Sequence, residues 1–309
     1  MKKLIILLGI ISAGLNTKAQ QEAMFTHYSF NTLQVNPAYA SSRDALTVLA
    51  LQRSQWIAFP GAPVTQTATA HMPVFNEKIG LGISLLHDKI GPSKNTGIFI
   101  DLAYKIKVAE KGKLAFGLKG GTSFLSNSVG DLDKNDPGDG VLIQNIQSRL
   151  LPNFGFGLYY SMPRFYVGLS SPKLLTNKLG TNTSGNGIAY ESRHYFVIAG
   201  AMFDLNKSAK LQLKPTTFLK ITSGAPLELD LTALLYYDNK FWAGPMFRSG
   251  DAFGILIGMN ITQQYSLGYC FDWSYGNSTG KYNAGSHELM LRYDFVFKNK
   301  TQILSPRYF

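Results

Sequence analysis

Residues 98–108 read IFIDLAYKIKV and alternate between two kinds of side chain. The even positions are all apolar or aromatic, whereas the odd positions carry Phe, Asp, Ala, Lys and Lys. Because successive side chains of a β-strand point to opposite faces, this pattern predicts a strand with one apolar and one mixed face. Residues 227–237 and 289–298 alternate in the same way. Runs of about ten residues exceed the usual five or six of globular sheets and suit tilted strands that cross a membrane.

The same alternation recurs along the chain and predicts about fourteen strands, the even number expected of a single-chain bacterial barrel. The candidate strands are 45–53, 63–72, 79–90, 95–108, 112–125, 150–161, 164–170, 191–205, 209–221, 226–238, 240–248, 252–261, 264–275 and 285–298. The long connections all follow odd-numbered strands, and they are 54–62, 126–149, 171–190 and 276–284. Outer-membrane barrels have long outer loops and tight periplasmic turns. The sequence therefore predicts an all-β, antiparallel outer-membrane β-barrel with both chain ends in the periplasm.

The start of the chain has the layout of a secretory signal peptide. Lys2 and Lys3 precede the apolar run Leu4–Leu15, and Thr17-Lys18-Ala19 offers small residues for cleavage before Gln20. A helix that spans a bilayer needs about 20 apolar residues, so this shorter run does not suit a retained anchor. We expect residues 1–19 to be removed.

Three further segments follow. We expect residues 20–44 to form an N-terminal periplasmic or plug segment, since Phe25, Tyr28 and Phe30 need a place to be buried. Residues 45–298 would form the barrel. Residues 299–309 would form a C-terminal periplasmic tail.

The composition excludes several other classes of protein. Charged residues make up 16% of the chain and aromatic residues 13%, which suits strands that face lipid. Removing Lys2, Lys3 and Lys18 leaves 27 basic against 19 acidic residues, a charge of +8 from the +11 of the whole chain. These basic residues are spread over strands and turns, so we expect no nucleic-acid partner. The single cysteine, Cys270, excludes an internal disulfide.

No catalytic constellation is visible. Neither a Gly-x-Ser-x-Gly elbow nor a zinc or phosphate-loop spacing occurs. His87 and Asp88 are neighbours on a predicted strand and so point to opposite faces. We therefore expect a protein that is not an enzyme and holds no cofactor.

One acidic loop is a weak calcium candidate. Asp131, Asp133, Asn135 and Asp139 lie close together around Asp136, and Ca²⁺ prefers such oxygen ligands. The match to an EF-hand fails, because Asp136 replaces the turn glycine and Leu142 replaces the closing glutamate. We favour a solvated acidic outer loop.

Several motifs, from the start of the mature chain to its end, resemble the PorP/SprF family of the type IX secretion system. Those motifs are Asn36-Pro37-Ala38-Tyr39-Ala40, Arg43-Asp44, Arg53-Ser54-Gln55-Trp56, Gly61-Ala62-Pro63-Val64-Thr65-Gln66-Thr67, Gly80-Leu81-Gly82, Asp88-Lys89-Ile90-Gly91, Leu291-Arg292-Tyr293-Asp294-Phe295 and Ser305-Pro306-Arg307-Tyr308-Phe309. Ser41-Ser42 departs from the Gly-Ser pair expected there. The candidate partner-binding or structural residues are Asn36, Pro37, Tyr39, Arg43, Trp56, Gly61, Pro63, Ser305, Pro306, Arg307, Tyr308 and Phe309.

The resemblance implies an outer-membrane component of type IX secretion, associated with gliding and the export of surface adhesins. It implies three kinds of partner: a secreted adhesin or its C-terminal domain, other secretion components such as a peptidoglycan-associated periplasmic protein, and outer-membrane lipid. The alternative is a porin-like diffusion channel for small solutes. Cations on the polar strand faces would then favour anions, and they are Lys105, Lys107, Arg193, Lys214, Lys220 and Arg292.

Overall fold

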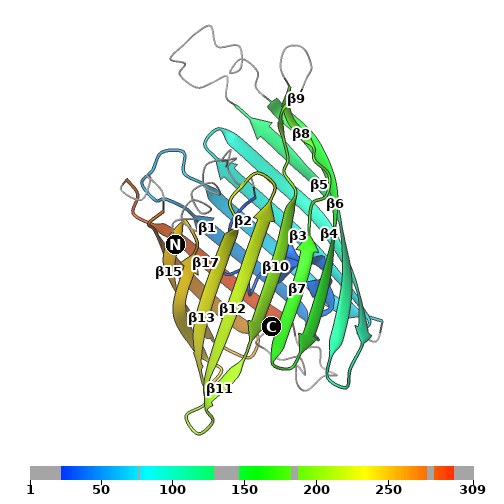
Figure 1. Cartoon of the computed structure of the whole chain (residues 1–309), viewed down its shortest axis with the longest axis vertical. Coiled ribbons are helices and arrows are strands. Elements are labelled where there is room, and N and C mark those ends of the chain that lie inside the picture. Colours follow the sequence, from blue (N-terminus) through cyan, green and yellow to red (C-terminus); the bar gives the residue numbers. More distant parts are fainter. Residues whose placement is uncertain (1–21, 76, 129–145, 182–186, 277–281, 296–309) are drawn as a thin grey trace, which may run out of the picture.

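The computed structural model describes residues 22–75, 77–128, 146–181, 187–276 and 282–295 (Figure 1). The main sheet consists of β1 (Leu46–Ser54), β2 (Val64–Val74), β3 (Ile79–Ile90), β4 (Ser93–Lys107), β5 (Lys113–Asn127), β6 (Ile146–Met162), β7 (Phe165–Ser171), β10 (His194–Ala201), β11 (Phe203–Asn206), β12 (Leu211–Thr222), β13 (Glu228–Tyr237), β14 (Phe241–Arg248), β15 (Ala252–Asn260), β16 (Tyr265–Ser274) and β17 (Ser286–Phe295). Among these described residues, no helix is long and apolar enough to cross a membrane.

These strands close into an antiparallel barrel. β1 pairs with β17, which joins the first strand to the last, and β10 pairs with both β7 and β12. β11 pairs with β12 just beyond β10, so the fifteen strands of the sheet fill fourteen positions in the wall. The predicted fold class and strand number are confirmed.

The wall has charged residues inside and apolar residues outside, the reverse of a soluble protein. Asp230 and Glu288 are fully buried, whereas their neighbours Leu231 and Leu289 are 42% and 51% exposed. Since strand neighbours point to opposite faces, the apolar residues form the outer surface and the charged ones the lumen. The alternation read from residues 98–108 has the same arrangement, because Asp101 is buried and Ile100 is 63% exposed.

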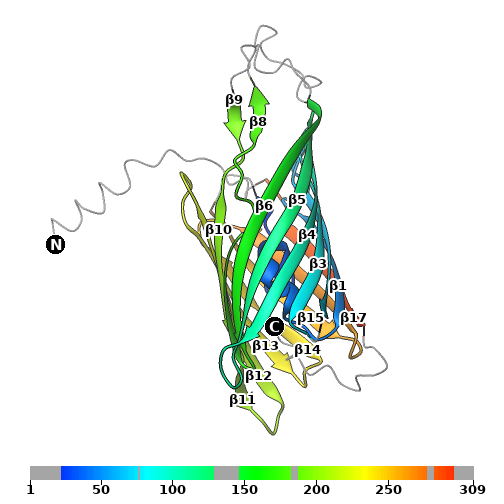
Figure 2. The same cartoon turned by 90° about the vertical axis from the view of Figure 1, so that its right-hand side faces the viewer.

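The two ends of the barrel differ. One end, which we call the short-turn end, carries the connections 75–78, 108–112, 163–164, 207–210, 238–240 and 261–264. The other, the long-loop end, carries all the long connections, as the sequence predicted. A small hairpin, β8 (Lys178–Thr181) with β9 (Gly187–Tyr190), projects beyond it in a region predicted to be loop (Figure 2). Another difference is that the predicted strand 191–205 is divided at Met202, whose N–H instead bonds Arg164 O at 2.8 Å.

The segment before β1 fills the interior of the barrel, and we call residues 22–45 the plug. It contains a short helix, α2 (Thr32–Val35), and a 3₁₀ helix, η1 (Pro37–Ser41), both enclosed by the strands (Figure 2). Its first described residue, Glu22, contacts Lys173 at the long-loop end, and it reaches Asp294 at the short-turn end through Arg43. The described part of the plug thus runs from the long-loop end, at Glu22, to the short-turn end, at Arg43.

Candidate functional site

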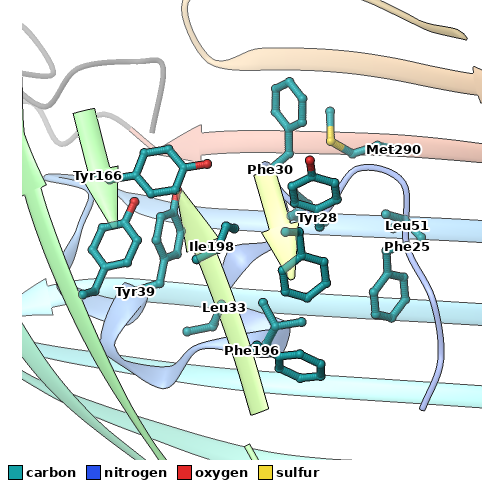
Figure 3. Packing of buried hydrophobic residues seen from close by; sticks show 14 of the residues in the cluster. Phe25, Tyr28, Phe30, Leu33, Tyr39, Leu51, Tyr166, Phe196, Ile198 and Met290 are labelled. Carbon is teal, nitrogen blue, oxygen red and sulfur yellow. The ribbon is translucent and has the colours of Figure 1, made fainter. Parts of the chain in front are cut away.

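The plug supplies the apolar core that the barrel itself lacks. Phe25, Tyr28, Leu33 and Tyr39 are all at most 5% exposed. They pack against inward residues of the wall such as Phe196, and Figure 3 shows these side chains gathered inside the lumen. A lumen lined by inward apolar residues would otherwise expose them to water, so the plug and the wall bury each other.

A buried cluster of charges contacts the plug near the long-loop end, and we call it the clamp. It consists of Thr26 and His27 of the plug and of four wall residues, Arg53, Arg248, Asp272 and Glu288. The Arg53 guanidinium lies 2.7 Å from Asp272 and 3.1 Å from Glu288. All of these wall side chains are at most 1% exposed. A buried charge is tolerated only when paired and hydrogen-bonded, so each member depends on the others.

The plug completes the hydrogen bonding of the clamp. The backbone N–H groups of Thr26 and His27 donate to the two Glu288 oxygens at 2.8 and 2.6 Å. The Thr26 hydroxyl donates to Asp272 at 2.8 Å and accepts from Arg53 at 2.9 Å. His27 Nδ1 lies 2.6 Å from Glu288. The wall residues of the clamp therefore bind the backbone N–H groups of Thr26 and His27 and the Thr26 hydroxyl.

Beside the clamp, the charge network continues along the wall. Arg248 pairs with Asp230 at 3.1 Å, and Lys220 pairs with Asp230 at 3.2 Å and also with Glu228. These residues lie on the adjacent strands β12, β13 and β14, which β15 separates from β16, β17 and β1. Opposite charges in this low-dielectric interior reinforce one another.

Aromatic stacking holds the middle of the plug. Phe30 stacks on Trp242 with ring centroids 4.8 Å apart, and the Lys214 ammonium lies 4.9 Å from the same ring. Tyr28 stacks on Phe218 at 5.0 Å. The Trp242 ring packs over the neighbouring strand because glycine stands there: a Cβ at Gly258, its partner on β15, would come within 2.1 Å of the ring.

A second contact lies nearer the short-turn end, and we call it the cradle. There Asn36, Pro37 and Ala38 of the plug pack against three glycines of the wall, Gly117, Gly157 and Gly168. A Cβ at Gly117 would lie 2.1 Å from Ala38 N, and one at Gly157 would lie 2.1 Å from Asn36 Oδ1. Real Cβ atoms do not approach so closely, hence these wall positions admit glycine alone without movement of the plug.

Asn36 uses its whole amide in the cradle. Its Nδ2 donates to Leu158 O at 3.0 Å, which ties the plug to β6. Its Oδ1 accepts from Ala38 N at 3.0 Å and caps η1, with Pro37 at the first position of that helix. The side chain thus both starts the short helix and fixes it to the wall.

Between the cradle and the short-turn end, the plug ends in aromatic contacts of Tyr39 and an ion pair of Arg43. Tyr39 packs edge-on against His71 and Tyr159 at 5.3 and 5.4 Å between centroids. Arg43 pairs with Asp294 at 2.9 Å, and both are about 2% exposed. Thr47, at the start of β1, donates to the same carboxylate at 2.7 Å. The last strand is thereby fixed to the end of the plug.

At the long-loop end the plug begins with an ion pair outside the strands. Glu22 lies 2.7 Å from Lys173 Nζ, and Lys173 lies 3.2 Å from Glu191. Burial alone would raise the pKa of Glu22, but the Lys173 ammonium and its hydrogen bond hold that pKa below its usual value. The pair is therefore ionised at neutral pH.

A second group of predicted residues lies apart from the plug, in the connection 55–63 at the long-loop end. Trp56 Nε1 donates to Ser274 Oγ at 3.3 Å, and Trp56 adopts a positive φ of 45°. Gly61 has φ 74° and its carbonyl accepts from Gly91 N at 2.9 Å. Pro63 O accepts from Gln55 N at 2.9 Å and closes the loop. These residues shape the outer rim.

The structure divides the predicted site residues into separate groups. Asn36, Pro37, Tyr39 and Arg43 come together in the lower lumen, whereas Trp56, Gly61 and Pro63 lie at the opposite end. The signal peptide 1–19, the tail 299–309 with Ser305, Pro306, Arg307, Tyr308 and Phe309, and the calcium candidate Asp131, Asp133, Asn135 and Asp139 fall outside the described residues. Within the described ranges no cluster of His, Cys, Asp or Glu could hold a metal ion.

Sequence reasoning missed the clamp. Arg53 was noted only as part of a motif, and Thr26, Asp272 and Glu288 were not singled out. One signal was available: polar strand faces carry several charged residues within two residues of a strand end at the long-loop end of the barrel, and they are Glu228, Asp230, Arg248, Asp272 and Glu288. Barrel closure brings those ends together, and charges of both signs then meet in the lumen.

Comparison with solved structures finds other barrels at low identity. The CymD monoaromatic hydrocarbon channel is 9% identical, with 93% of this chain and 97% of that chain covered and a TM-score of 0.49. The outer membrane protein Omp33 of Acinetobacter baumannii is 10% identical over 83% and 100%, with a TM-score of 0.45. A Pseudomonas aeruginosa FadL homologue is 13% identical over 87% and 94%, with a TM-score of 0.45. At these scores the likeness says nothing of what this chain transports or binds.

The sequence itself is more informative. A search of curated proteins finds no match. The family model described as type IX secretion system membrane protein PorP/SprF matches residues 17–293. That match includes the plug, the cradle, the clamp and the barrel strands up to residue 293, two residues before the end of β17. The chain therefore belongs to the PorP/SprF family of type IX secretion proteins and resides in the outer membrane.

Proposed function

We propose that this protein receives or anchors a secreted surface protein, an adhesin or its C-terminal domain, at the long-loop end of its barrel. At the short-turn end it contacts periplasmic components of the secretion machine. The orientation follows from the rule that long loops of such barrels face outward. Family membership supports the role in secretion, and the plugged lumen supports a docking role over a transport role.

The filled lumen is the observation that carries the proposal. Plug contacts extend along the interior from Glu22 beside Lys173 to Arg43 beside Asp294. Clamp and cradle hold the plug by buried ion pairs and close backbone contact. A barrel of this size could otherwise hold a pore, since eight strands already fill with side chains and 16 leave a channel. A firmly seated plug leaves the rims as the surfaces for partners.

The long-loop rim offers a hollow suited to a protein partner. A cavity of about 680 Å³ is lined by the connection 55–63 together with Lys89, Gly91 and Pro92. Ile57 and Phe59 on this rim are 39% and 37% exposed. Aromatic and apolar residues in a shaped hollow are typical of interface hot spots. Backbone bonds between Ile57 and residues 284–285 fix the loop to the β16–β17 connection.

The experiment compares two rim variants in the native host. Phe59→Ala should reduce both surface retention of the secreted protein and binding of its purified C-terminal domain by about tenfold or more, the effect of losing one hot-spot residue. Leu227→Ala removes an even more exposed apolar residue from the same end, on the opposite wall, and should change neither. Equal retention in all strains, including a deletion of the whole gene, would contradict the proposal.

The diffusion channel is the second candidate, and inward cations favour it. Lys214, Lys220 and Arg292 all lie buried in the lumen. Planar-bilayer conductance separates the two functions. The plugged barrel should conduct weakly, and deletion of residues 25–30 should raise its conductance. High, anion-selective conductance of the intact protein would support the channel instead.

A further inference from the structure

The short-turn rim has lysines on two sides of the barrel, and the two groups differ in how many carboxylates lie close to them. On the side of β11 to β14, Lys210 and Lys240 lie 2.8 and 3.6 Å from the Asp238 carboxylate. Arg164 on that side pairs with Asp204. Each acidic group there thus has a cationic partner.

The opposite side, around the connections 75–78 and 108–112, collects lysines with too few acids. Lys78, Lys107, Lys111 and Lys113 are exposed, and no carboxylate of the described chain lies within ion-pair distance of any of them. They line a hollow of about 450 Å³ together with Tyr104 and Ile106. Lys105, Glu77 and Glu110 also line it.

The strand register brings like charges together, which destabilises this part of the sheet. Lys107 and Lys113 are direct partners across β4 and β5 on the polar strand face, and both are exposed where these strands extend past the end of β3. Like charges placed directly opposite destabilise a sheet. An anion seated in the hollow would remove this repulsion, and a lysine side chain offers three donors to it.

The surface above the hollow is apolar and faces the membrane. Tyr104 lies opposite Phe116, and Leu102 opposite Leu81, with each of these side chains 43–51% exposed. At the turn, Phe75 is 77% exposed. An apolar wall that ends in an aromatic side chain and then a cationic hollow matches a molecule with acyl chains and an anionic headgroup.

We propose that this hollow binds the headgroup of an anionic phospholipid, whose acyl chains lie along the outer face of β3 to β5. A free anion would use the lysines but not the apolar column. An acidic protein would meet the lysines from the water side and would gain nothing from Leu81, Leu102 or Phe116.

The test measures lipid retained by the purified full-length protein in native mass spectrometry. Phosphatidylglycerol should bind, and phosphatidylcholine with the same chains should not. Each lysine near an anionic headgroup contributes about fivefold in affinity, so Lys107→Gln, Lys111→Gln and Lys113→Gln together should weaken binding about a hundredfold. The matched control is Lys207→Gln, Lys210→Gln and Lys240→Gln on the other side of the rim, which should leave binding unchanged. Heat-modifiable gel mobility verifies that both triple variants are folded.

Three results would overturn the proposal. Equal loss in both triple variants would mean that only the net charge matters. Equal binding of phosphatidylcholine would remove the role of the lysines. Full competition by inorganic phosphate or glycerophosphoglycerol, which lack acyl chains, would assign the hollow to a free anion instead.

Discussion

The clamp and the cradle hold the same plug by opposite means. In the clamp, charged side chains reach from the wall and meet backbone N–H groups of the plug. In the cradle, the wall has no side chains at all, and the backbone of the plug fills the space that glycines leave. Substitutions that remove a charged group should therefore weaken the clamp, whereas substitutions that add a side chain to a glycine should weaken the cradle. A plug fixed in both ways resists release from either end.

The largest effect should come from removing one charge of the clamp. Arg53→Met leaves Asp272 and Glu288 without their shared cation in a buried site, which costs about 3–5 kcal/mol. The native Cys270 thiol, buried on the lumen face, reports release of the plug. Its labelling by a water-soluble maleimide should accelerate more than about a hundredfold.

The control for Arg53 is an exposed pair. Arg164 is 61% exposed beside Asp204, so Arg164→Met should leave both stability and Cys270 labelling nearly unchanged. If Arg53→Met behaves like Arg164→Met, the clamp does not hold the plug.

A smaller effect should follow from adding one methyl group to the cradle. In Gly117→Ala the new Cβ meets Ala38 N, and such overpacking costs about 1–3 kcal/mol. Gly120→Ala on the same strand adds a Cβ with nothing within 4 Å and serves as the control. Labelling of Cys270 should separate the two variants by about tenfold or more. Identical rates would show that the plug moves aside at no cost.

Loss of the cradle amide should be weaker again. Asn36→Ala removes the bond to Leu158 O and the cap of η1, a loss of about 1–2 kcal/mol. A reporter cysteine at Ala115, on the wall near Gly117, should become labelled sooner than Cys270. Gln52→Ala breaks the exposed amide pair with Gln66 and should leave both sites protected. Simultaneous exposure of both thiols would mean that clamp and cradle release as one unit.

The smallest effect concerns pH at the start of the plug. The folded pKa of Glu22 is lowered, so its pairing with Lys173 stabilises the plug fully above the unfolded value of about 4.3. That stabilisation is lost as the pH falls through the lower folded pKa. The mobility of a spin label at Ala23→Cys should therefore rise on acidification below about pH 4. Glu22→Gln should be as mobile at neutral pH as the parent is in acid, and a flat profile in the parent would refute this role.

Much of the fold could be read from the sequence, because alternation and loop length are local properties. Residues 98–108 predict inward Asp101 and outward Ile100, and the barrel has both. The direction of the plug could not be read, since it depends on contacts such as Glu22 with Lys173 and Arg43 with Asp294, more than a hundred residues apart. The cradle was equally hidden, because a glycine on a strand reads as a weak strand residue until its neighbour across the lumen is known.

The seam between β1 and β17 imposes an order on folding. Arg53 belongs to β1, Glu288 and Asp294 to β17, and Thr26 and Arg43 to the plug that precedes both. The seam pairs Leu46 with Phe295, so the loop it closes is nearly the whole barrel. Closing so long a loop is entropically costly and slow. A plug seated before the seam forms would present Thr26 and Arg43 to both of its strands, since Arg53 of β1 and Glu288 and Asp294 of β17 contact these residues. In that order of events the plug would serve as a template for the register of the last strand.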